Sequence, residues 1–385
     1  MHEQYDVIVV GVGAMGSAAC CELARRGARV LGIERFDIPN ALGSSHGFSR
    51  MIRLCYYEHP DYVPLLRRAY ALWRRLEDDG GHKLLHVTGG VYIAREGNEL
   101  VTGSRASAER HGLEHEFLDR AQLARRFPQF QLPDDYVALY EPMAGWLPPE
   151  RVVAAFAEQA LRRGARLHAH EAVRTWSADP SGVSVATDRA EYRAGRLIIC
   201  GGPWSARLLR DLQIELTVTR QVMTWVWPKR PERFEAGALP VWAVGHDDGT
   251  LHYGFPLTSG DAGVGLKLAH HARGPVTDPD RVAREPLAGD ERSVREFVQR
   301  FLPDADGPLL AQRVCLYTNS PDAHFIVDRH PRFDQRVMFA CGFSGHGFKF
   351  ASVIGEALAE LAVRGATALP IDFLSLRRFA QQSRR

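Results

Sequence analysis

The 385-residue sequence has few cysteines, little net charge and no long apolar run, and each absence narrows the possible functions. Its 6 cysteines include no Cys-x-x-Cys pair, so we expect no disulfide framework and no metal site, but free thiols in a reducing compartment. The 48 basic residues nearly balance the 46 acidic ones, and a net charge of +2 predicts no general attraction to nucleic acid or membranes. Any functional positive charge must therefore be local.

No uninterrupted apolar stretch reaches the roughly 18 residues that a membrane-spanning helix needs. Residues 7–21 are apolar enough to resemble the core of a secretion signal, but Glu3 and Asp6 precede them and no lysine or arginine does. The chain ends at Ser383-Arg384-Arg385, which is not the peroxisomal Ser-Lys-Leu signal. Because these signals are missing, we expect a cytoplasmic protein. Its hydrophobic content of 45% predicts a globular fold.

The N-terminal segment has the pattern of a dinucleotide-binding unit. Residues 6–10 (DVIVV) form a short β-branched run, followed by the loop GVGAMG, a helix-like stretch SAACCELARRGA and a second strand-like run RVLGIE. In the G-x-G-x-x-G loop, Gly11 permits a tight turn, Gly13 lets the backbone approach a pyrophosphate, and Gly16 permits close packing of the helix. The order of strand, loop, helix and strand therefore predicts dinucleotide binding.

The helix after this loop is expected to point its N-terminus at the phosphates. Its unpaired N–H groups and partial positive charge would stabilise them. Glu34, at the end of the second strand, is placed to accept a hydrogen bond from a ribose hydroxyl. Its charge also disfavours a 2′-phosphate, although the adjacent Arg35 weakens that inference. The glycines alone do not distinguish NAD from FAD.

The rest of the chain alternates between helix and strand without internal repeats or a low-complexity linker. We expect helices where large apolar residues recur every three or four positions, and strands where β-branched and aromatic residues cluster. Because α/β stretches recur in the middle and at the end, we expect two domains that are interleaved in the sequence. The expected helices are 62–77, 149–163 and 351–363, and the expected strands are 87–94, 166–170, 196–200, 216–227, 241–244, 250–255, 264–268 and 337–340.

Three further segments carry a resemblance to a known family. They are SSHGFSRMIR from Ser44, CLYTNSPDAHFIVDRHP from Cys315 and CGFSGHGFKF from Cys341. Together with GVGAMG, and in this order over nearly the whole chain, they resemble the monomeric sarcosine oxidase and N-methyltryptophan oxidase family. The resemblance implies an α/β fold in which a Rossmann-type FAD-binding domain joins a second α+β domain built on an antiparallel sheet. We place the FAD-binding domain at 1–85, 150–216 and 318–385, and the substrate domain at 86–149 and 217–317.

The resemblance also implies an activity. A member of this family is expected to oxidise an N-methyl amino acid with O2 and water, releasing formaldehyde, hydrogen peroxide and the free amino acid. It would act as a monomer, with no nucleic-acid or membrane partner. FAD would carry the chemistry. The residues expected to contact FAD are Gly11, Gly13, Ala14, Met15, Gly16, Glu34, Arg35, Ser44, His46, Ser49, Arg50, Val173, Gly201, Trp204, Cys315, Gly342, Gly345, Gly347, Phe348 and Lys349.

Cys315 is expected to be linked to the 8α-methyl group of the flavin. On composition alone it is one of six thiols and would be interpreted as a small buried hydrophobe. Its neighbours Tyr317 and Thr318, together with the later SGHGFKF, match the motif that carries the tether in the family.

Two cations are expected to bind the substrate carboxylate. A carboxylate in a largely apolar pocket needs positive partners, and arginine suits a two-point contact. Arg53 and Lys349 match the family's carboxylate pair, although a lone Arg or Lys is more often a solvated surface charge. Tyr253 and His271 match positions near the substrate amine, with a core tyrosine and a surface histidine as the alternatives.

The reaction with oxygen is expected to use nearby positive charge. Transfer of one electron to O2 makes superoxide, which a cation stabilises in a site of low dielectric constant. Lys267, in the segment GLKL, matches the family lysine with that role. Arg50 matches a second cation beside the flavin, and His46 matches a neighbouring polar contact.

The sequence leaves the substrate open. Many relatives read HGDTR and RHAY where this chain has Phe48, Ser49, Leu54 and Cys55. An oxidase of a larger secondary amine, such as N-methyltryptophan or pipecolate, is therefore an alternative. A nicotinamide-dependent dehydrogenase or a dinucleotide-binding regulator would also fit the N-terminal motif.

Overall fold

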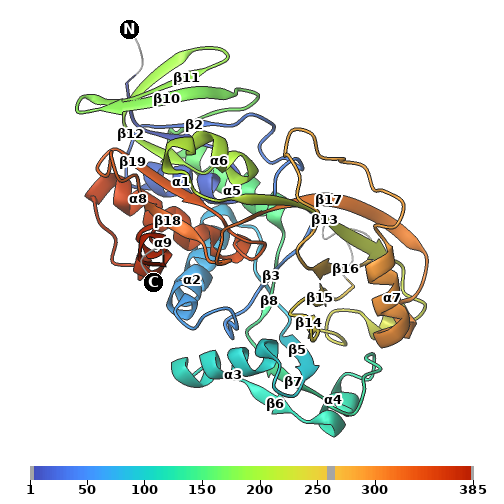
Figure 1. Cartoon of the computed structure of the whole chain (residues 1–385). Coiled ribbons are helices and arrows are strands. Elements are labelled where there is room, and N and C mark those ends of the chain that lie inside the picture. Colours follow the sequence, from blue (N-terminus) through green and yellow to red (C-terminus); the bar gives the residue numbers. More distant parts are fainter. Residues whose placement is uncertain (1–3, 258–264, 383–385) are drawn as a thin grey trace.

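The structure is a computed structural model that describes residues 4–257 and 265–382, and it contains two large sheets and a small one (Figure 1). The first large sheet has the strand order β10-β11-β12-β1-β2-β9, and β19 and β18 continue from β12. Its strands are β1 (Tyr5–Val10), β2 (Val30–Ile33), β9 (Arg166–His168), β10 (Val173–Asp179), β11 (Gly182–Thr187), β12 (Glu191–Ile199), β18 (Ile326–Arg329) and β19 (Val337–Cys341).

The predicted N-terminal βαβ unit is confirmed. Strand β1 pairs in parallel with β2 on one side and with β12 on the other. Both faces of β1 are covered, which explains why its sequence is a nearly continuous apolar run. Between β1 and β2 runs α1 (Ala14–Arg25), which starts at the glycine loop.

Four helices pack together beside this sheet and bury a large apolar core. Helix α1 contacts α5 and α8, and α2 contacts the same two helices. The approach of α8 to α1 is close, since a Cβ on Gly355 would lie 2.5 Å from the Cβ of Ala18. Besides α1, these helices are α2 (Tyr62–Gly80), α5 (Pro149–Arg162) and α8 (Ala351–Arg364).

The second large sheet has the order β17-β13-β16-β15-β14-β5-β7-β6 and is antiparallel except where β14 pairs with β5. It lies on the right in Figure 1, with α7 (Arg292–Phe301) beside it. Its strands are β5 (Gly90–Arg95), β6 (Glu116–Leu118), β7 (Tyr136–Glu141), β13 (Thr217–Val226), β14 (Val241–Gly245), β15 (Leu251–Gly254), β16 (Leu266–His271) and β17 (Leu309–Asn319).

The third sheet is small and consists of β3, β8 and β4, which come from segments far apart in the sequence. In Figure 1, β3 and β8 lie between the two large sheets. The elements not yet placed are β3 (Arg50–Ile52), β4 (His86–Val87), β8 (Gly145–Leu147), α3 (Glu99–His111), α4 (Arg120–Arg126), α6 (Ser205–Leu208), α9 (Arg377–Gln382) and the short helices η1 (Gly202–Trp204), η2 (Arg210–Leu212), η3 (Pro231–Arg233), η4 (Pro303–Ala305), η5 (Phe348–Phe350) and η6 (Asp372–Leu374).

The fold is thus the α/β arrangement expected from the sequence, with a second, mainly antiparallel sheet. The assignment of segments to two domains stays a prediction, and β17 runs across the expected boundary between 317 and 318 as one continuous strand paired with β13. In the described part of the chain, no helix is both long enough and apolar enough to cross a bilayer.

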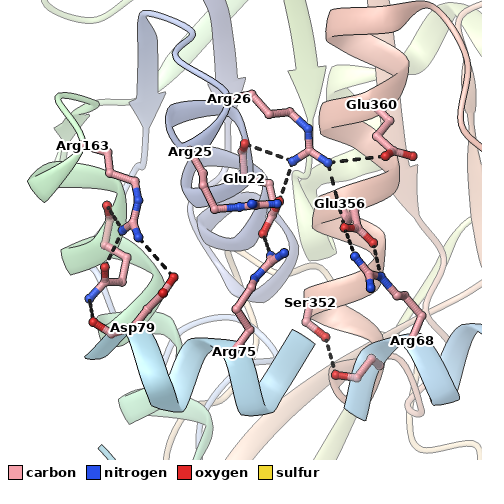
Figure 2. A network of polar contacts seen from close by, with 12 residues as sticks. Glu22, Arg25, Arg26, Arg68, Arg75, Asp79, Arg163, Ser352, Glu356 and Glu360 are labelled. Carbon is pink, nitrogen blue, oxygen red and sulfur yellow. Dashed lines mark hydrogen bonds and ion pairs between the residues drawn. The ribbon is translucent and has the colours of Figure 1, made fainter. Parts of the chain in front are cut away.

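An ion-pair network fastens α1 to its neighbouring helices (Figure 2). At its centre is Glu22 of α1, a carboxylate that is only 2% exposed. Glu22 pairs with Arg25 of its own helix, with Arg26 directly after the helix end, and with Arg75 of α2. Arg26 also reaches Glu360 of α8 at 3.4 Å. The C-terminal end of α1 is therefore held from two sides.

We predict that Glu22→Gln lowers the free energy of unfolding by about 2 kcal/mol, because three arginines lose a buried counter-charge. Denaturant unfolding of the purified protein measures this. The matched control is Glu109→Gln, which breaks an ion pair with Arg105 whose side chains are 54% and 52% exposed. That change should cost less than about 0.5 kcal/mol. Equal losses for the two variants would show that the network does not stabilise the fold.

Candidate functional site

A cavity of about 510 Å³ extends from the glycine loop to the inner face of the second sheet. It unites most of the site residues expected from the sequence. Those on its wall are Gly11, Gly13, Ala14, Met15, Glu34, Arg35, Ser44, Arg50, Arg53, Val173, Gly201, Trp204, Tyr253, His271, Cys315, Gly342, Gly345, Gly347, Phe348 and Lys349. The expected site residues that do not line the cavity are Gly16, His46, Ser49 and Lys267.

The loop after β1 is shaped for a close approach of backbone and ligand. Gly11 has φ +86°, and a Cβ there would lie 2.3 Å from the carbonyl oxygen of Cys200, so no other residue fits. The following helix α1 has no side-chain cap at Gly13, which leaves N–H groups at its N-terminus available to an anion. This end of the cavity fits a pyrophosphate.

Glu34 lies at the end of β2, as expected, and is almost fully buried. Its carboxylate accepts hydrogen bonds from the N–H groups of Val12 (2.8 Å) and Phe36 (3.1 Å). Burial raises the pKa of this carboxyl, and these backbone donors oppose the rise. Glu34 therefore fixes the glycine loop and also lines the cavity where a ribose would follow the phosphates.

Asp280 closes the same end of the cavity, and no motif in the sequence indicated it. Its carboxylate accepts hydrogen bonds from Arg35 (2.8 Å), from the indole of Trp204 (2.8 Å) and from Arg207. Burial acts to raise its pKa, but these donors lower the pKa to about 2. Asp280 thus stays ionised and ties the loop after β16 to the first sheet's edge.

Cys315 lies on β17 and is only 2% exposed, yet it reaches the cavity wall. Arg50 is its cationic neighbour, with Nη2 3.5 Å from the sulfur. The same guanidinium donates to the carbonyls of Ser49 (3.0 Å) and Ser44 (3.1 Å), which holds it in place. The thiol of Cys315 therefore lies at the cavity wall with a fixed guanidinium beside it.

Arg53 is buried and already has a carboxylate partner. Its Nη2 lies 2.7 Å from both carboxylate oxygens of Glu58, and its Nη1 donates to the carbonyl of Cys55 at 3.0 Å. Burial acts to lower the pKa of Arg53, but Glu58 raises it above its usual value. Burial acts to raise the pKa of Glu58, and Arg53 lowers it to about 2. Both groups are therefore charged near neutral pH.

Lys349 approaches the same point from the turn before α8. Its Nζ donates to the carbonyl of His346 at 2.8 Å and lies 5.2 Å from the centre of the Tyr56 ring, over which Arg53 also lies at 4.3 Å. Burial and the charge of Arg53 lower the pKa of Lys349 to about 7, against the opposing effect of Glu58. The two expected carboxylate-binding cations therefore converge.

His271 and Tyr253 form the opposite side, on the inner face of the second sheet. His271 Nδ1 is 3.1 Å from the hydroxyl of Tyr317, and Tyr317 also pairs with Tyr253. Burial lowers the pKa of His271 to about 4, so its imidazole is neutral at pH 7. Gly345, with φ +81°, lets the turn before α8 pass over Tyr317, since a Cβ would lie 2.4 Å from that ring.

Two expected residues, Lys267 and His46, do not line the cavity but lie close to Arg50 in the chain or in space. Lys267 donates to the carbonyls of Gly47 (2.7 Å) and Ser49 (2.5 Å), and burial together with Arg50 lowers its pKa well below the usual value. Neither ring nitrogen of His46 has a hydrogen-bond partner among the described residues, and burial lowers its pKa to about 3. Both side chains lie beside the loop that carries Arg50.

Sequence reasoning missed three side chains that shape the site. Glu58 follows Arg53 by five residues, so an acid this close to a motif arginine was the available signal. Tyr317 belongs to the motif around Cys315 but was not proposed as a site residue. Asp280 gave no signal, because only the folded chain brings it to Arg35 and Trp204.

Comparison with known proteins agrees with this geometry. Residues 6–361 match the family described as FAD dependent oxidoreductase. The monomeric sarcosine oxidase of Streptomyces avermitilis is 43% identical over 383 residues, covering 99% of each chain. The N-methyl-L-tryptophan oxidase of Yersinia pestis is 35% identical over 379 residues, covering 97% of this chain and 99% of the relative. Among solved structures, NikD, described as an unusual amino acid oxidase essential for nikkomycin biosynthesis, has a TM-score of 0.83 at 27% identity and covers 97% of each chain.

Proposed function

The chain belongs to the FAD dependent oxidoreductase family, and we propose that it oxidises N-methyl amino acids with O2 and water. The products would be formaldehyde, hydrogen peroxide and the demethylated amino acid. The observation that carries this proposal is that Arg53, Lys349 and a neutral His271 line one cavity. The names of the sarcosine and N-methyltryptophan oxidases among its relatives support the choice of substrate class.

The residues at the cavity wall fit FAD. The glycine loop and the open N-terminus of α1 would hold its pyrophosphate, and Glu34 would hold a ribose. The turn of Gly342, Gly345 and Gly347 before α8 would offer backbone N–H groups to the flavin end. When bound, FAD supplies the capacity to accept two electrons from the substrate and pass them to O2. We propose that Cys315 tethers it, because its sulfur reaches the cavity wall next to the guanidinium of Arg50.

Arg53 and Lys349 would bind and orient the substrate carboxylate. Glu58 neutralises part of their charge, so the incoming carboxylate completes the balance when Lys349 is protonated. Binding of the carboxylate at these two cations would determine which carbon of the substrate faces the cofactor. Orientation of this kind supplies much of an enzyme's rate enhancement.

His271 and Tyr253 would face the substrate amine. A neutral imidazole can accept a hydrogen bond from an uncharged secondary amine, and it adds no positive charge that would repel it. Tyr317 fixes the ring of His271 through Nδ1, which leaves the other nitrogen free for the substrate. The site would thus select the amine in its reactive form.

Lys267 and Arg50 would provide positive charge for the reaction with O2. Lys267 is buried and its pKa is low, but two backbone carbonyls accept from its amino group and stabilise its protonated form. Negative charge that develops nearby would favour protonation further.

We also propose that the protein is a cytoplasmic monomer, in keeping with its free cysteines and the name of its monomeric relatives.

The activity is tested by incubating the purified protein with N-methyl amino acids in air. We expect hydrogen peroxide and formaldehyde in equal amounts, with O2 consumption that does not depend on added NAD or NADP. Substrate-dependent reduction of NAD without peroxide would instead identify a nicotinamide-dependent dehydrogenase. No turnover of any amine would favour a regulatory dinucleotide-binding protein.

The tether is tested by acid denaturation of the wild type and of Cys315→Ala. The wild type should keep its yellow colour and a flavin-sized added mass on the peptide that contains Cys315, whereas the variant should release its FAD. Cys200→Ala is the matched control, because Cys200 is also a buried thiol on the cavity wall. Release of free FAD from the wild type would refute the covalent bond.

Lys349 should make anion binding depend on pH. With a pKa of about 7, it is charged below this pH and neutral above it. The affinity for acetate should therefore be constant at low pH and fall by up to tenfold per unit above about pH 7. Glu58 and His271 titrate far below this window.

Calorimetry on the holoenzyme measures the affinity, with two variants of Lys349 as controls. Lys349→Met should bind acetate weakly at every pH between 6 and 8.5. Lys349→Arg keeps the charge and should bind without the fall above pH 7. A wild-type affinity that does not change over this range would contradict the assignment of Lys349.

A further inference from the structure

The second sheet contributes apolar and aromatic side chains to the cavity wall, in addition to the cations Arg53 and Lys349 described above. Tyr253 of β15 lies directly opposite Ala243 of β14 and Ala269 of β16. Residues paired across antiparallel strands share a face of the sheet, and Leu251 shares it because it lies two positions before Tyr253. Both alanines and Tyr253 line the cavity, so the small side chains of Ala243 and Ala269 form part of its wall.

Three side chains from other elements also line the cavity beside this surface. They are Met51 of β3, Tyr57 and Leu100, which lies near the start of α3. We define the apolar chamber as Met51, Tyr57, Leu100, Ala243, Leu251 and Tyr253, all of which line the cavity.

The exposed parts of these side chains face the interior. Met51, Tyr57 and Tyr253 are half-buried, and they pack against buried apolar clusters. Burial raises the pKa of the hydroxyl groups of Tyr57 and Tyr253, as it would for groups remote from bulk water. Their accessible surface therefore belongs to the cavity, and an apolar group placed against it would leave water.

The chamber begins next to the carboxylate-binding cations. The guanidinium carbon of Arg53 lies 4.8 Å from the centre of the Tyr57 ring and 5.7 Å from that of Tyr92. Tyr92 in turn pairs with Ala243 across β5 and β14. A molecule whose carboxylate binds Arg53 would therefore place its next few carbon atoms in the chamber.

We propose that the apolar chamber receives the side chain of the substrate, and that the enzyme prefers N-methyl amino acids with an aliphatic side chain over N-methylglycine. The proposal rests on the function proposed above and names the substrate class. N-methylglycine has no side chain to fill this space, whereas a leucine-sized group would bury several carbon atoms against Leu251, Ala243 and Met51. Ala243 would then be a residue that determines specificity.

Binding alone tests the chamber without any turnover. Acetate and 4-methylpentanoate share the carboxylate, but only the second carries the leucine skeleton. Calorimetry on the holoenzyme at pH 6 should give at least tenfold tighter binding for 4-methylpentanoate. In Ala243→Leu, which fills the chamber, this preference should fall to threefold or less. Ala186→Leu, on β11 and away from the cavity wall, should keep it.

Turnover then separates the two proposals. We expect kcat/KM for N-methyl-L-leucine to exceed that for N-methylglycine at least tenfold, and this ratio to collapse in Ala243→Leu. If N-methylglycine is the better substrate and the aliphatic tail does not tighten binding, the chamber proposal is wrong while the oxidase function stands. If the tail tightens binding but no N-methyl amino acid is oxidised, the chamber stands and the oxidase function is wrong. A preference for N-methyl-L-tryptophan over N-methyl-L-leucine would overturn the aliphatic class.

Discussion

The site depends on the burial of Arg53, Glu58 and Lys349 together in an apolar interior. An isolated charge there would be strongly unfavourable, and the ion pair between Arg53 and Glu58 removes most of that cost. Lys349 is the third member, and its pKa of about 7 reflects a group for which one carboxylate is not sufficient compensation. The cavity is therefore electrically incomplete when Lys349 is protonated. A substrate carboxylate would complete it.

The rest of the fold holds these charges against the cofactor end of the cavity. Arg53 follows β3, whereas Lys349 belongs to the turn that precedes α8. Helix α8 packs on α1, and α1 is held at its C-terminal end by the Glu22 network while its N-terminal end opens toward the cavity. One set of packed helices therefore positions both the proposed phosphate site and the proposed carboxylate site. A shift of α1 would move both, which explains why so many ion pairs surround Glu22.

Site residues could be predicted from the sequence where they belong to a motif of neighbouring residues. The strand, loop and helix around Gly11 and the motif around Cys315 are local, and the structure brings both to the same cavity. Contacts made only by folding could not be predicted in this way. Asp280 contacts Arg35, which is 245 positions away in the chain. The place of Ala243 beside Tyr253 follows from the register of β14 and β15, which the sequence does not show. Arg53 was expected from the resemblance, but its partner Glu58 was not, because the loop that joins them has no regular pattern.

Charge and apolar surface together would decide the orientation of a substrate. The carboxylate has a favourable place between Arg53 and Lys349, because their two positive charges exceed the one negative charge of Glu58 when Lys349 is protonated. An aliphatic side chain has one favourable place as well, because the chamber beside Ala243 offers apolar surface next to that same guanidinium. With both ends fixed in this way, the amine between them would face His271, which lines the same cavity. The same contacts would then determine both the substrate specificity and the geometry of the reaction. Loss of the carboxylate contact or of the side-chain contact would leave the C–N bond poorly oriented toward the cofactor that Cys315 is proposed to hold.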